Sequence, residues 1–80
     1  MESVIATIPK NSREHIRIGL NEFKGHNLFS VRVWVSKAAG AAPLPTQKGL
    51  TAAVALLPAI IEALQETLKQ AYDSGVLPHG

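Results

Sequence analysis

The residues of this chain that are best suited to chemistry are cations interleaved with aromatic residues. They form two short clusters, Phe23-Lys24-Gly25-His26 and Arg32-Val33-Trp34. Single-stranded nucleic acids are held by cations that neutralise phosphates and by aromatic faces on which bases stack. The clusters therefore favour nucleic-acid binding. The alternative is structural, with Phe23 packed on its own hairpin and Trp34 packed at a contact between subunits.

Four strands must position these clusters. Alternating apolar residues, many of them β-branched, predict strands over residues 3–10, 13–23, 28–35 and 46–52. Gly25 can adopt the positive φ that a tight hairpin between the second and third strands needs. Simple alternation would put Lys48 and Leu50 on one face of the last strand, so we expect a bulge at Gly49.

A helix is predicted over residues 54–73. Its apolar residues recur every three or four positions, which is the spacing of one helix face. The main ones are Leu57, Ile60, Ile61, Leu64 and Leu68. This apolar stripe is wider than one small sheet needs, so we interpret these five residues as a dimer interface. The alternative is an ordinary stripe that faces the core of its own chain.

The predicted fold class is α+β, a four-stranded antiparallel sheet followed by one C-terminal helix, assembled as a homodimer. We expect the single helix to cover one face of the sheet. The other face would stay open and would carry Arg17, Phe23, Arg32, Trp34 and Lys48. On that face the cations would contact phosphates, and the aromatic rings would stack on bases or support the surface around them.

Length and charge bound the possible functions. Eighty residues, 46% of them hydrophobic, suffice for one domain over residues 1–80. Because the chain has no cysteine and its core must be small, a second copy is the natural way to enlarge that core. Residues 1–50 hold seven Lys and Arg against three acidic residues, a balance of +4, whereas residues 51–80 hold one against three, a balance of −2. The basic part predicts an anionic partner. The alternative is a solvated surface of mixed charge.

The sequence contains no recognisable catalytic constellation. His15, His26 and His79 do not stand at metal-ligand spacing, no serine lies in a nucleophile elbow, and the spacing of a phosphate loop is absent. We therefore expect a protein that is not an enzyme and that needs no metal or cofactor. We find neither a signal peptide nor an apolar run long enough to cross a membrane. The expected location is the cytoplasm, in association with the nucleoid.

Three motifs, in order, resemble those of the positive cofactor four family of single-stranded DNA-binding, transcriptional coactivator-like domains. They are Glu22–His26, Val31–Trp34 and Pro45–Leu50, within a similarity that runs roughly from Ile5 to Leu68. The third-strand motif and the helix start look more like the bacterial or phage branch. The resemblance implies the same sheet and helix, dimerisation through the helices, and single strands or melted duplex lying over the sheet.

The resemblance also implies roles for individual residues. By their positions in the motifs, the DNA contacts fall on Phe23, Lys24, His26, Arg32 and Lys48. The sequence departs from the family pattern at three places. The loop over residues 38–44 is apolar where relatives tend to be polar or acidic. Gln47 stands where a basic residue is common, and the family's contact tryptophan aligns with Val35, one position beyond Trp34.

The sequence thus predicts a homodimer that binds single-stranded or melted DNA with little sequence specificity, like a transcriptional coactivator or regulator. The transcription machinery is a further expected partner. Two alternatives stay open. One is a dimer that recruits a protein partner in transcription or replication. The other is an RNA-binding protein, because stacking surfaces often accept either nucleic acid.

Overall fold

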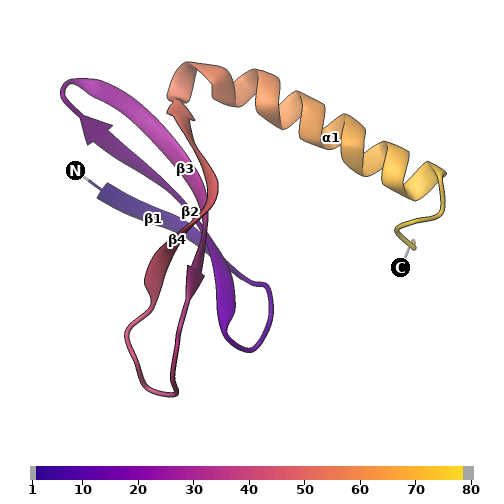
Figure 1. The fold of residues 1–80 in the computed structure, drawn as a ribbon. Helices are drawn as coiled ribbons and strands as arrows, with labels where there is room; N and C mark the ends of the chain where they lie inside the picture. Colours follow the sequence, from indigo (N-terminus) through magenta and orange to yellow (C-terminus); the bar gives the residue numbers. More distant parts are fainter. Residues whose placement is uncertain (1, 79–80) are drawn as a thin grey trace.

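The computed structural model describes residues 2–78, which form one antiparallel sheet followed by one long helix (Figure 1). The strands are β1 (Glu2–Pro9), β2 (Glu14–Phe23), β3 (His26–Val35) and β4 (Leu44–Ala53). A short 3₁₀ turn, η1 (Val54–Leu56), leads into helix α1 (Leu57–Asp73). Neighbouring strands in the chain are neighbours in the sheet, in the order β1-β2-β3-β4. The predicted α+β class is confirmed. His79 lies outside the described residues.

Local sequence explains the turns that set the strand registers. Lys24 and Gly25 both have positive φ, 51° and 80°, which is the backbone of a tight two-residue hairpin. The predicted role of Gly25 is therefore confirmed. Asn11 organises the turn between β1 and β2, because its side-chain oxygen accepts hydrogen bonds from the backbone N–H groups of Arg13 and Glu14 at 2.9 and 2.8 Å.

Two glycines allow close backbone approach within the sheet. A Cβ on Gly19 would collide with the carbonyl oxygen of Ser3, at the place where the register between β1 and β2 shifts. Gly49, with φ of 151°, lies so close to Arg32 that an added Cβ would stand 2.7 Å from the Arg32 Cα. The pairing of β3 with β4 is irregular beside it, so the predicted bulge is confirmed.

The strand registers divide the sheet into two faces of different chemistry. Residues directly opposite each other on antiparallel strands project to the same side. The polar face carries His15, Arg17, Gly19, Asn21 and Phe23 of β2, His26, Leu28, Ser30, Arg32 and Trp34 of β3, and Thr51 of β4. The centre of the apolar face carries Ile16, Ile18 and Leu20 of β2, Phe29, Val31 and Val33 of β3, and Leu50 of β4. At its two ends the register also places Glu14 and Glu22 of β2 and Asn27 of β3.

Helix α1 extends away from the sheet and leaves both faces uncovered (Figure 1). The expectation that this helix covers one face of its own sheet is therefore wrong. The physical reason is the connection, because η1 follows β4 without a loop in which the chain could turn back. The 3₁₀ turn η1 lies close to β3. Phe29 on the apolar face is 2% exposed and is the one fully buried side chain among those described.

Large apolar side chains consequently remain in contact with solvent in the single chain. In α1, Leu57 and Ile60 are half-buried, whereas Ile61, Leu64 and Leu68 are exposed, Leu64 by 61%. Ile5 of β1 is 64% exposed. Such a patch on a small domain usually marks an interface.

The ends of α1 follow ordinary capping chemistry. Pro58 lies in the first turn, where the missing N–H has no intrahelical acceptor to lose. Gly75, with φ of 79°, ends the helix and donates its N–H to the carbonyl of Tyr72 at 3.2 Å. Within residues 2–78, no helix is long and apolar enough to span a membrane.

Candidate nucleic-acid interface

Two arginines stand directly opposite each other at the centre of the polar face. Arg17 of β2 pairs with Arg32 of β3. Like charges in such a pair repel each other, and the sheet separates them by holding the two side chains on different partners. The ion pairs among the described residues are Lys10–Glu14 and Lys69–Asp73. Neither pair includes Arg17 or Arg32. Both guanidinium groups therefore lack an anionic partner.

Arg17 is held by an aromatic ring and an imidazole. Its guanidinium carbon lies 3.9 Å from the centroid of the Trp34 ring, which is a close cation–π contact. Its Nε donates a hydrogen bond to Nε2 of His15 at 2.9 Å. His15 and Trp34 are themselves directly opposite each other in the β2–β3 register. The three side chains therefore form one group, in which Trp34 supports Arg17.

Arg32 is held across β4 by two oxygen acceptors. One terminal nitrogen donates to the backbone carbonyl of Thr46 at 3.1 Å, and the other donates to the Thr51 hydroxyl at 3.0 Å. Gly49 is the residue opposite Arg32, and the lack of a side chain there leaves room for the arginine to lie over the strand. The bulge at Gly49 thus determines the direction of the Arg32 side chain.

The hairpin tip presents the second cluster. Phe23 and His26 are directly opposite each other, and the Phe23 side chain is 57% exposed. The Lys24 ammonium lies 5.4 Å from the centroid of the Phe23 ring. The register therefore brings an aromatic ring, an ammonium and an imidazole together at one end of the polar face.

Lys48 precedes Gly49, the residue of β4 that lies opposite Arg32. Its backbone N–H donates to the Thr46 hydroxyl at 3.1 Å, inside the irregular part of β4. The pKa of Glu14 is lowered, first by the hydrogen bond that the Asn11 side chain donates, then by Lys10, with a smaller contribution from Lys48. The charge of Lys48 thus acts at the end of the sheet where β2 begins.

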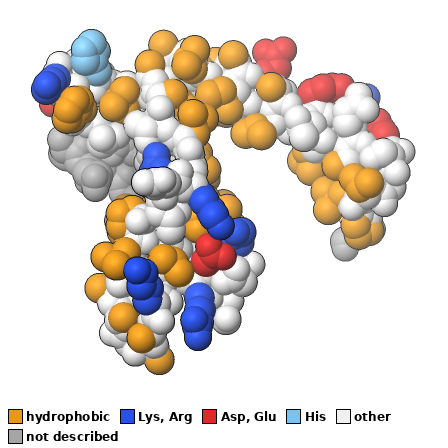
Figure 2. Space-filling model, in the orientation of Figure 1, with side chains coloured by type: hydrophobic (Ala, Val, Ile, Leu, Met, Phe, Trp, Pro, Cys, Tyr) orange, Lys and Arg blue, Asp and Glu red, His pale blue; other side chains and the backbone are white. Residues whose placement is uncertain are grey.

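Charge is distributed unevenly over the molecule (Figure 2). Most of the blue Lys and Arg side chains in view lie on the sheet and at the hairpin tip, with one red patch among them, whereas most of the charged side chains seen on α1 are red. Phosphates would therefore meet attraction at the sheet and repulsion at the helix.

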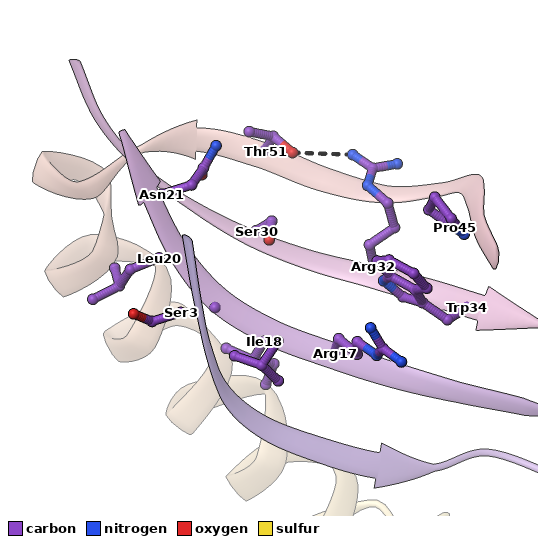
Figure 3. Close-up of a pocket in the computed structure, with 12 residues that line it drawn as sticks. Ser3, Arg17, Ile18, Leu20, Asn21, Ser30, Arg32, Trp34, Pro45 and Thr51 are labelled. Carbon is purple, nitrogen blue, oxygen red and sulfur yellow. Dashed lines mark hydrogen bonds between the residues drawn. The ribbon is translucent and has the colours of Figure 1, made fainter. Parts of the chain in front are cut away.

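A hollow of about 300 Å³ opens on the polar face between the two arginines and Asn21, near the end of β2 (Figure 3). The polar residues that line it come from all four strands and include Ser3, Arg17, Asn21, Ser30, Arg32 and Thr51. Gly19 and Ser30, directly opposite each other, are the small residues that leave this space open. None of the described residues that line the hollow is acidic.

Sequence reasoning found the arginines, the aromatics and Lys24, and it missed the residues that hold or separate them. The missed residues are His15, Asn21, Ser30, Thr46 and Thr51. The sequence could have predicted that Asn21 and Ser30 share this face. Each stands an even number of positions from an arginine on the same strand, Asn21 from Arg17 and Ser30 from Arg32. Thr46 and Thr51 had no such signal because the bulge in β4 breaks the alternation.

Comparison with known proteins decides the family. The family described as Transcriptional Coactivator p15 (PC4) matches residues 10–63, well over half of the sequence. The chain belongs to this family. The PC4 match begins before β2 and ends inside α1, so it includes the whole polar face from His15 to Thr51. Leu64 and Leu68 of the apolar stripe lie beyond it.

Solved structures of PC4 homologues are similar to this chain. Two crystal forms of a homologue from Burkholderia pseudomallei are 26% and 27% identical, with TM-scores of 0.74 and 0.75. The matches cover 81% and 84% of this chain and 86% and 97% of those chains.

A phage protein shares the fold. It is a bacteriophage T5 homologue of the eukaryotic transcription coactivator PC4, implicated in recombination-dependent DNA replication. It is 18% identical, with a TM-score of 0.57, and the match covers 96% of this chain and 82% of that one. No curated protein matches in sequence. The predicted family is confirmed, and the similar structures come from the bacterial and phage branch that the motifs favoured.

Proposed function

We propose that this PC4-family protein is a homodimer that binds single-stranded or melted DNA on the polar face of the sheet, with little sequence specificity. The observation that carries the proposal is the pair of opposed arginines without anionic partners. Each guanidinium group stands on the same face, is held by uncharged partners and can still bind an anion. A phosphate backbone supplies a row of such anions.

The aromatic side chains favour a single strand as the source of those phosphates. Phe23 is exposed at the hairpin tip beside Lys24 and His26, where a base can stack on its ring. In a duplex, the bases are already stacked and paired, so their faces are not available to such a ring. Arg17, Lys24, Arg32 and Lys48 are the proposed phosphate contacts, and Trp34 acts by supporting Arg17.

The dimer is proposed because the single chain buries too little. Its helix leaves the apolar face open, and Phe29 alone among the described side chains is fully buried. A second copy would bring the same apolar surfaces and would cover both the apolar face of the sheet and the apolar stripe of α1. The proposed helix contacts are Leu57, Ile60, Ile61, Leu64 and Leu68. The polar face would then stay free for DNA on each protomer.

The proposed cellular role follows from the family and from DNA binding. It is coactivator-like regulation of transcription, or another process that exposes single strands, in contact with the transcription machinery. The T5 homologue's involvement in replication supports the wider version. The proposed location is the nucleoid of the cytoplasm, and the proposed chemistry is binding without catalysis, metal or cofactor. Within the described residues, no three potential metal ligands gather.

Fluorescence titration tests the proposal. Trp34 is the one tryptophan of the sequence, and it lies against Arg17, so its emission reports on the polar face. We expect oligo-dT to bind more tightly than a duplex of equal length. With four phosphate contacts, log K should fall against log salt with a slope of about −3, since each contact on a single strand contributes roughly −0.7. Equal affinity for duplex, or affinity that is indifferent to salt, would refute it.

Two further measurements separate the alternatives. A matched oligo-U titration measures RNA binding, and tighter binding of RNA would reassign the polar face to RNA. Sedimentation of the purified protein measures its assembly state. A monomer that remains folded would contradict the proposed dimer.

A further inference from the structure

The hollow on the polar face contains hydrogen-bonding groups that the chain does not use. The side chains of Asn21 and Ser30 are half-buried, and neither makes a hydrogen bond within the described structure. In Figure 3 both stand on the same side of the sheet as Arg32 and Thr51. An amide offers two donors and one acceptor, and a hydroxyl offers both. Unpaired groups of this kind around a polar space indicate a ligand with a matching polar edge.

The depth of the hollow comes from residues that cannot be enlarged freely. Gly19 has no side chain, and β1 lies so close to it that a Cβ would collide with the Ser3 carbonyl. Ser30, directly opposite Gly19, has a small side chain that leaves the space above it open. The hollow thus lies over Gly19 and Ser30, with Arg32 and Trp34 at one end and Asn21 at the other (Figure 3).

We propose that this hollow receives one unpaired nucleobase of the bound strand, with its edge on Asn21 and Ser30. The proposal rests on the proposed function, because the strand must first lie on the polar face. The phosphates next to that base would lie on Arg17 and Arg32, at the rim of the hollow. A volume of about 300 Å³ admits a flat heterocycle but not a base pair with its two backbones.

The consequence is that single-strand preference has two sources. Phosphate contacts by the arginines are available to any strand and weaken with salt. The base in the hollow must leave its neighbours and present its hydrogen-bonding edge, which a paired base cannot do. The hollow therefore adds a contribution to affinity that depends on the base and is insensitive to salt.

Three variants of the dimer isolate this contribution. Asn21→Ala removes the amide, and Ser30→Leu fills the hollow. Asn27→Ala is the matched control, because Asn27 is exposed on β3 and projects, like its register partner Glu22, to the side of the sheet opposite the hollow. Each variant is titrated with oligo-dT and with a strand of the same length that is fully abasic, at two salt concentrations. Circular dichroism and sedimentation establish that each variant folds and assembles as the wild type does.

We expect Asn21→Ala and Ser30→Leu to weaken oligo-dT binding by about three- to tenfold, the effect of losing one or two hydrogen bonds. Their affinity for the abasic strand and their salt slope should equal those of the wild type. Asn27→Ala should change neither affinity.

The outcomes separate the two proposals. If Asn21→Ala and Ser30→Leu bind oligo-dT as tightly as the wild type while Arg32→Ala binds it less tightly, the base subsite is wrong and DNA binding stands. Wild-type protein that binds the abasic strand as tightly as oligo-dT also overturns the subsite. If wild-type protein binds neither strand, the proposed function itself fails. Should Ser30→Leu not fold, Asn21→Ala alone decides.

Discussion

The two faces of the sheet come from the same strands, and each lacks a different kind of partner. On the polar face, Arg17 and Arg32 are held by uncharged partners and lack an anion. On the apolar face, Ile18 and Val31 lie among other aliphatic side chains and lack a cover, since α1 extends away. Alternate side chains of a strand point to opposite sides, so a single register built both surfaces. In the proposed function, a second copy of the chain completes the apolar face and a DNA strand completes the polar face.

The largest expected effect is on the apolar surfaces. Leu64→Glu puts a charge into the proposed helix contact, where the free carboxylate would be buried without a partner. We expect a loss of about 3–5 kcal/mol per protomer, the range for disrupting a buried leucine, and hence loss of both dimer and fold. Sedimentation and circular dichroism measure the two. Gln70→Glu is the control, because it adds the same charge to the polar side of α1 and should leave the dimer intact.

The next largest effect is on DNA binding, and we expect it from a charge removed from the polar face and not from one removed from α1. Arg32→Ala removes one phosphate contact, so oligo-dT affinity should fall by about tenfold at low salt and the salt slope should become less steep by roughly 0.7. The dimer should persist, as sedimentation would show. Lys69→Ala removes the same charge from α1, where Lys69 pairs with Asp73, and should leave affinity nearly unchanged. Equal losses in both variants would mean that only net charge matters, and would erase the distinction between the faces.

A moderate effect is expected from the stack of Arg17 on Trp34. If Trp34 acts by supporting Arg17, Trp34→Leu and Arg17→Ala should each weaken binding, and the double variant should be little worse than Arg17→Ala. A double-mutant cycle should give a coupling of about 0.5–1 kcal/mol, the strength of a partly exposed cation–π contact. Additive losses would instead assign Trp34 its own contact with a base. Titrations of these variants need a fluorescent oligonucleotide, since Trp34→Leu removes the intrinsic reporter.

The smallest expected effect lies at the rim of the sheet, where Glu14 accepts hydrogen bonds from Asn11 and Lys10. Its pKa in the folded protein is lowered, chiefly by the Asn11 side chain, below the ordinary value of 4.5. A lowered pKa means that Glu14 contributes stability above pH 4.5 and loses it as pH falls through the folded value. The melting temperature of the wild type should therefore be slightly above that of Glu14→Gln at pH 7, and the difference should shrink as pH falls below 4.5. A difference that grows on acidification would contradict this assignment.

Much of the fold follows from the sequence because its signals are local. Alternation predicted the strands, Gly25 predicted the tight hairpin, and Gly49 predicted the bulge. Each of these depends on a few neighbouring residues. The position of the helix does not, and the expectation that α1 covers its own sheet was wrong because the absence of a connecting loop matters more than the apolar stripe.

The sequence by itself determined which residue types share a face, because the strand period of two sorts them whatever the partner strand is. Arg17 and Phe23, and likewise Arg32 and Trp34, were predictable companions for this reason. Only the tertiary structure decided what each one touches. The register between strands put Arg17 opposite Arg32, sent one to Trp34 and the other to Thr46 and Thr51, and left a hollow over Gly19. Register joins residues distant in the chain, so a short pattern in the sequence does not contain it.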